Sequence, residues 1–86
     1  LKIMVYLIFT SEGFNEALAE IVEHKGKLWI NDGILNAQQK TILSEHHIDF
    51  HILESKVEVT DEKAIISAIK TIEQRMESAE LFVEFL

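Results

Sequence analysis

The amino-acid sequence predicts one small α/β domain over residues 1–86, with strands and helices in the order β-α-β-α-β-α-β. Short apolar runs alternate along the chain with stretches whose apolar residues recur every three or four positions. The 86 residues suffice for a single domain, and with three Gly and no Pro little interrupts regular structure. Such alternation is typical of a three-layer domain, with right-handed crossovers and helices on both faces of a mostly parallel four-stranded sheet.

The first strand is expected at residues 2–9, which are apolar on both faces, as in an interior strand of a parallel sheet. The helix that follows is predicted from one apolar stripe, formed by Phe14, Ala17, Leu18, Ile21 and Val22. Ser11 is the expected N-cap of this helix, and Gly26 is expected to end it in the left-handed conformation.

The second strand is expected at Lys27–Asn31 and is followed by an Asn-Asp-Gly turn. A hairpin at this turn is rejected, because residues 34–36 do not alternate as a strand would. Asn36 and Gln39 instead form the pattern of a capping box, which predicts a second helix extending to about His46.

A third strand is expected at Ile48–Leu53, a third helix beginning near Asp61, and a last strand at Leu81–Leu86. The preferred sheet order is 2-1-3-4, which places the most apolar strand, residues 2–9, in the interior. An antiparallel last strand is the main alternative.

Composition excludes several classes of function. The net charge of −7 repels phosphate backbones and anionic lipid, so neither nucleic acid nor a membrane is an expected partner. With no Cys, thiol chemistry is excluded, and a cytoplasmic location is expected. The chain begins with Leu1 and stops inside an apolar stretch, so a fragment of a larger protein stays an open alternative.

Ligand sites of open α/β sheets lie beyond the carboxyl ends of the strands. In this chain those ends supply the candidate ligand-binding residues Thr10, Ser11, Gly13, Asn31, Asp32 and Ser55. The first loop holds one Gly, so it has neither the dinucleotide-binding fingerprint nor a P-loop. The alternative is that these residues act only as caps and turns.

The densest group of potential metal ligands is His47, Asp49 and His51, which alternate onto one face of the third strand. The two His would lie roughly 13 Å apart in a strand, too far to share one ion. No metal site and no cofactor are therefore expected, with Asp49 and His51 as the remaining candidate pair.

Two surfaces are candidates for protein interaction. Glu12, Glu16 and Glu20 form an acidic ridge on the first helix, suited to a solvated face or to a basic partner. The last strand is expected at a sheet edge and is apolar on both faces, with Phe82, Val83 and Phe85 as its interaction residues.

The hypothesis that follows is a non-catalytic interaction or regulatory module that forms a homo-oligomer or binds a protein partner. The alternative is a small-ligand, anion-binding domain or enzyme with its site at the strand ends.

Overall fold

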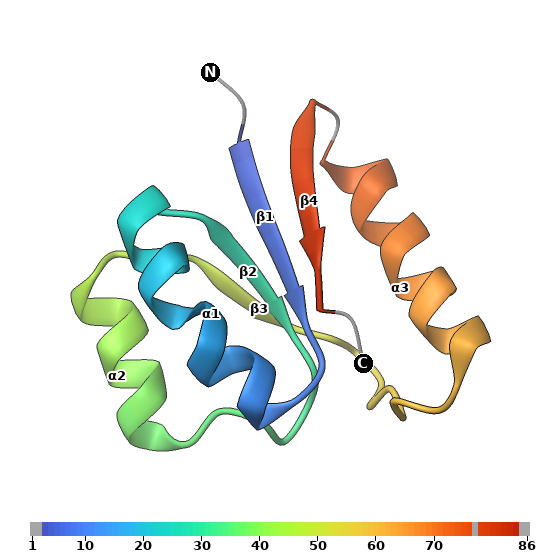
Figure 1. Ribbon diagram of the computed structural model, residues 1–86, viewed down its shortest axis with the longest axis horizontal. Coiled ribbons are helices and arrows are strands. Elements are labelled where there is room, and N and C mark those ends of the chain that lie inside the picture. The colour runs from blue at the N-terminus through green and yellow to red at the C-terminus, as the bar shows by residue number, and fades with distance from the viewer. Residues whose placement is uncertain (1–2, 77, 85–86) are drawn as a thin grey trace.

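A computed structural model describes residues 3–76 and 78–84 and shows four parallel strands and three helices (Figure 1). The elements are β1 (Ile3–Ile8), α1 (Ser11–His24), β2 (Lys27–Ile30), α2 (Ala37–Glu45), β3 (Phe50–Ile52), α3 (Glu62–Arg75) and β4 (Ala79–Val83). The predicted α/β class is confirmed, and the last strand is parallel to β1 rather than antiparallel.

The sheet lies between α1 and α2 on one face and α3 on the other (Figure 1). Alternate side chains of β1 divide between the two cores. Tyr6 and Ile8 pack with Phe14 and Leu43 beneath α1 and α2. On the opposite face Val5, Leu7 and Phe9 pack with Ile72 of α3. The interior position predicted for this strand is therefore confirmed.

The predicted strand order of 2-1-3-4 is wrong, because the sheet has the order β3-β2-β1-β4. β3 pairs with β2 at one edge, and β4 pairs with β1 at the other. The observed order follows from the character of β2, whose Leu28, Trp29 and Ile30 are all buried. A strand that is buried on both faces is favoured in the interior of the sheet, with a strand on each side of it. In β3, His51 and Ile52 are exposed, as suits an edge strand.

Two helix-end predictions are corrected and one is confirmed. Thr10, not Ser11, is the N-cap of α1, and its hydroxyl accepts a hydrogen bond from the Gly13 N–H at 3.0 Å. At the other end Lys25, not Gly26, has the left-handed conformation, with φ of 50°. Gly26 is instead buried, and a Cβ there would overlap the ring of Tyr6. The Asn36–Gln39 capping box of α2 forms as predicted.

The last strand is Ala79–Val83 rather than the predicted Leu81–Leu86. The predicted interaction residue Phe85 lies outside the described residues. The observed strand order leaves part of each sheet face without a helix above it. A groove lies beside β4 on the α1 face, and another lies beside β3 on the α3 face.

Candidate functional site

The predicted ligand crevice lies between β1 and β4, where the chain direction across the sheet reverses. α1 begins there, directly after β1, so its first N–H groups point toward the crevice. In many α/β proteins an anion binds at this position.

A side chain of the protein itself occupies this position. The Glu84 carboxylate accepts hydrogen bonds from the N–H of Phe9 at 2.7 Å and of Thr10 at 3.0 Å, and a third from the Thr10 hydroxyl. A Cβ on Gly13 would overlap the same carboxylate, so this glycine makes room for Glu84. The structure thus brings the predicted residues Thr10 and Gly13 together around an internal anion.

Asn31, another predicted ligand residue, is 3% exposed and has a full set of hydrogen bonds. Its amide Nδ2 donates to the carbonyl oxygens of Phe9 at 3.2 Å and Val57 at 2.7 Å. Its Oδ1 accepts from the N–H of Val57 at 2.8 Å and of Asp32 at 3.0 Å. Asn31 therefore ties together the end of β1, the end of β2 and the loop after β3.

The other predicted ligand residues do not converge on the crevice. Ser11 and Asp32 are exposed, and Asp32 is held through its N–H by Asn31. Ser55 is also exposed, and it lines the groove under α3 instead. The strand ends therefore do not form the single site that the sequence suggests.

The potential metal ligands of β3 are also separated. His47 precedes the strand with a left-handed backbone, φ 58°, and Asp49 lies before the first strand residue, Phe50. The His51 ring stacks on Trp29 with centroids 4.8 Å apart. Among residues 3–76 and 78–84, no three His, Asp or Glu side chains gather as metal ligands would.

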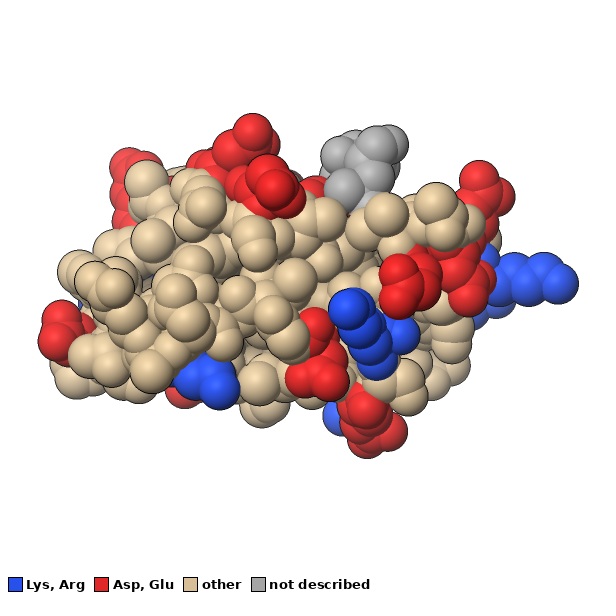
Figure 2. Space-filling model, turned by 90° about the horizontal axis from the view of Figure 1, so that it is seen from below, with Lys and Arg blue, Asp and Glu red and all other residues tan. Residues whose placement is uncertain are grey.

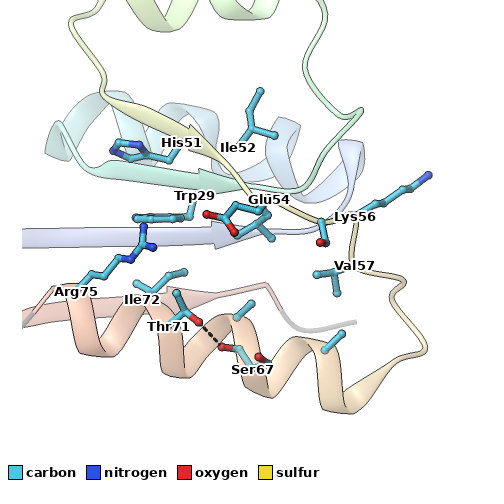
Figure 3. Close-up of a pocket in the computed structure, with 14 residues that line it drawn as sticks. Trp29, His51, Ile52, Glu54, Lys56, Val57, Ser67, Thr71, Ile72 and Arg75 are labelled. Carbon is cyan, nitrogen blue, oxygen red and sulfur yellow. Dashed lines mark hydrogen bonds between the residues drawn. The ribbon is translucent and has the colours of Figure 1, made fainter.

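The groove under α3 has a volume of about 370 Å³ and extends from β2 and β3 to one face of the helix (Figure 3). The Trp29 ring lies between His51 and Arg75, whose guanidinium carbon is 5.7 Å from the ring centroid (Figure 3). The indole Nε1 is buried and has no hydrogen-bond partner. Glu54 and Lys56 contribute opposite charges to the lining.

The second groove, of about 410 Å³, lies between α1 and β4 and is here called the α1/β4 groove. It unites residues predicted separately as interaction candidates: Glu16 and Glu20 from α1, and Phe82 and Val83 from β4. Glu12 lies in the first turn of α1, outside the residues that line the groove.

Tyr6 forms part of the floor of the α1/β4 groove, and sequence reasoning did not select it. Its ring stacks on Phe82 at 5.1 Å between centroids, with an angle of 18° between the planes. The hydroxyl is buried without a hydrogen-bond partner. Burial raises the pKa of this hydroxyl, and the Glu20 carboxylate raises it further through its charge and through an interaction with the hydroxyl that falls outside regular hydrogen-bond geometry. The charges of Glu80 and Glu23 add to the rise.

Sequence reasoning also missed Glu84, Trp29 and Arg75 as site residues. The sequence did contain a signal for Trp29 as a site residue, because Trp29 is a large aromatic side chain in β2, and the neighbouring strand β3 is partly polar. Glu84 and Arg75 carried none, since their partners Thr10 and Trp29 lie far away in the chain.

Comparison with known proteins adds no relative to this description. No protein-family model, no curated protein sequence and no solved structure matches the chain. No helix within residues 3–76 and 78–84 is long and apolar enough to cross a membrane.

Proposed function

We propose that this domain is a non-catalytic protein-interaction module that self-associates through the outer edge of β4. One observation carries the proposal: β4 lies at an edge of the sheet and pairs only with β1. An edge strand offers a row of main-chain donors and acceptors to another strand. Phe82, at 36% exposure, stands beside this edge.

The direction of the free main-chain groups follows from one hydrogen bond. The N–H of Glu84 donates to the carbonyl oxygen of Leu7 in β1 at 3.0 Å. N–H and C=O groups alternate in direction along a strand, so those of Ala79, Leu81 and Val83 point away from β1. These three residues would make the hydrogen bonds to a second copy.

Edge-to-edge pairing of two copies across a two-fold axis is antiparallel. If the axis passes through Leu81, Ala79 faces Val83 of the second copy, and Glu80 faces Phe82. If it passes through Phe82, Glu80 faces Glu84 of the second copy, and like charges directly opposite one another destabilise a sheet. The register centred on Leu81 is therefore the one we propose.

Two features support an interaction role over ligand binding at the strand ends. The N–H groups of Phe9 and Thr10 are bonded to Glu84, and the Asn31 amide is bonded to main-chain groups. These groups, which would otherwise receive a substrate or anion, already serve the fold.

Sedimentation equilibrium tests the proposal. The wild-type chain is expected to reach twice its 9.9 kDa mass at high micromolar concentration. Val83→Pro removes an outward N–H without removing a bond to β1, so it should give a folded monomer. Added salt should strengthen the dimer, because each copy carries a net charge of −7.

Ile52→Pro is the matched control at the other sheet edge. Leu53 donates its N–H to Ile30 in β2, so the N–H of Ile52 points outward from β3. The control variant should dimerise as the wild type does. A wild-type chain that stays monomeric at high micromolar concentration, or equal dissociation in both variants, would contradict the proposal.

Small-ligand binding under α3 is a second candidate function, favoured by the buried Trp29 Nε1 that has no hydrogen-bond partner. A ligand with an acceptor atom could satisfy this donor, and Arg75 lies beside it. Trp29 is the only Trp in the sequence, so its fluorescence reports on this groove alone. Saturable quenching by benzoate or phenyl phosphate, lost in Arg75→Gln, would support this function, and its absence would contradict it.

A further inference from the structure

We infer that the α1/β4 groove binds a cationic side chain, Arg or Lys, from a basic segment of another protein. The inference rests on the proposed function in that it assigns a partner to an interaction module. All residues of the groove nevertheless belong to one chain, so the inference and the proposed self-association can fail separately. Its floor, its rim and the charge around it support the inference independently.

The floor of the groove is aromatic. Tyr6 and Phe82 stack nearly in parallel across the β1–β4 pair, 18° between planes, and Phe82 keeps 36% of its surface exposed. Aromatic faces attract Arg and Lys side chains, and the attraction strengthens where water is partly excluded. The apolar part of a long basic side chain would also cover the exposed ring.

The rim of the groove is acidic. Glu16 and Glu20 lie four residues apart on α1 and so project from the same face of the helix. Both are exposed, and among residues 3–76 and 78–84 no Lys or Arg lines the groove. Figure 2 looks onto the end of the molecule where the strands finish and shows separate groups of acidic side chains along the left part of its upper border.

The Tyr6 hydroxyl is a further, independent feature. Tyr6 is 2% exposed and lines the groove, and its hydroxyl interacts with the Glu20 carboxylate without making a hydrogen bond of regular geometry within the described residues. A buried polar group of this kind is costly unless a partner reaches it. An Arg or Lys N–H donor entering between Glu20 and Phe82 would supply that partner while pairing with the carboxylate.

The charge on the groove indicates a basic partner rather than a second copy of the chain. A second copy also carries −7 and would bring its own acidic ridge. An antiparallel β4 pair places the α1 helices of both copies on the same face of the joined sheet. Self-association would thus set two acidic grooves side by side, which strengthens the attraction for a basic segment.

The test is a titration of fluorescein-labelled octa-arginine followed by fluorescence anisotropy at about 0.1 M salt, where charges farther apart than about 10 Å are screened. Wild type is expected to bind, and the variant E16Q/E20Q to bind at least about tenfold more weakly, since two charged contacts are lost. The control E45Q/E58Q makes the same charge change at exposed positions outside the groove. Its affinity should stay within about threefold of wild type, as expected for screened charges.

Phe82→Leu keeps an apolar side chain but removes the aromatic face, and should weaken binding about threefold. The same titration on the wild type, at concentrations where sedimentation equilibrium shows a monomer, separates this inference from self-association, because a single chain should still bind. Equal losses in E16Q/E20Q and E45Q/E58Q would overturn the inference, since binding would then follow net charge alone. Binding that appears only at concentrations where the chain is dimeric would overturn the claim that one chain completes the groove.

Discussion

The Glu84 carboxylate at the end of β4 accepts a hydrogen bond from the N–H of Thr10, 3.0 Å away, and another from its hydroxyl. Thr10 is the N-cap of α1, so a side chain from the last strand completes the start of the first helix. A carboxylate at a helix N-terminus is also favoured by the helix dipole. The position where comparable folds bind phosphate is thus held by a structural contact.

Replacing Glu84 tests this contact directly. Glu84→Ala should lower the free energy of unfolding by about 2 kcal/mol, because charge-assisted bonds to Phe9 and Thr10 are lost in a half-buried site. Glu80→Ala removes the same charge from an exposed position on the same strand and should change stability by less than about 0.5 kcal/mol. Urea unfolding measures both. Equal losses of stability in the two variants would mean that removal of a negative charge, rather than loss of the Glu84 contact with Phe9 and Thr10, destabilises the protein.

Asn31→Ala should destabilise the protein by about 3 kcal/mol, measured by urea unfolding. The substitution leaves the buried Phe9 carbonyl and both main-chain groups of Val57 without the side chain that bonds them. The neighbouring Asp32 is exposed, and its side chain is not part of this set. Asp32→Ala should therefore change stability by about 0.5 kcal/mol or less. A comparable loss in both variants would contradict the stabilising role of the Asn31 hydrogen bonds.

Tyr6→Phe should raise stability at neutral pH by about 1 kcal/mol, because it removes a buried hydroxyl that has no partner. In the folded wild type the pKa of Tyr6 is raised, so the folded state keeps the proton to higher pH than the unfolded state. The resulting stabilisation is present below the unfolded pKa, about 10, and is lost as pH rises through the folded pKa.

The wild type should accordingly lose more stability than Tyr6→Phe between neutral pH and pH values above about 10. Tyr6 is the only Tyr in the sequence, so tyrosinate absorbance follows this one group. Titration of the folded chain at the ordinary Tyr pKa, or parallel stability profiles for the two proteins, would refute this account.

Lys25→Gly should raise stability by about 0.5–1 kcal/mol. Lys25 has φ of 50°, a left-handed conformation that costs an ordinary residue roughly 1–2 kcal/mol and glycine almost nothing. The greater freedom of glycine in the unfolded chain offsets part of the gain. Lys40→Gly, in the middle of α2, should instead cost about 1 kcal/mol. Thermal unfolding of both variants checks that their stability changes have opposite signs. A loss of stability in Lys25→Gly would refute the prediction.

Some features of this fold are local, and the sequence alone determined them. The capping box of α2 depends on Asn36 and Gln39, which are three residues apart and bond each other's main chain. The continuous apolar character of residues 3–9, on both faces of the strand, likewise predicted an interior strand. In such cases the interacting groups are near neighbours in the chain, so residue identity and spacing suffice to predict them.

The sequence contains a signal for the observed strand order. Leu28, Trp29 and Ile30 give β2 two apolar faces, whereas Asp49 and His51 give one face of β3 a polar character. That contrast favours β2 in the interior and β3 at an edge, as observed. The apolar character of β1 does not distinguish the two orders, since β1 is interior in both.

Only the tertiary structure decided which distant residues meet. Glu84 bonds Thr10, 74 residues away in the chain, and the α1/β4 groove joins Glu16 and Glu20 to Phe82. Both meetings require β4 to pair with β1, and the order of strands in a sheet depends on how all the helices pack. The sequence therefore determined the elements and many of their ends, whereas the packing of the whole chain determined the site, because contacts between distant residues leave no local pattern.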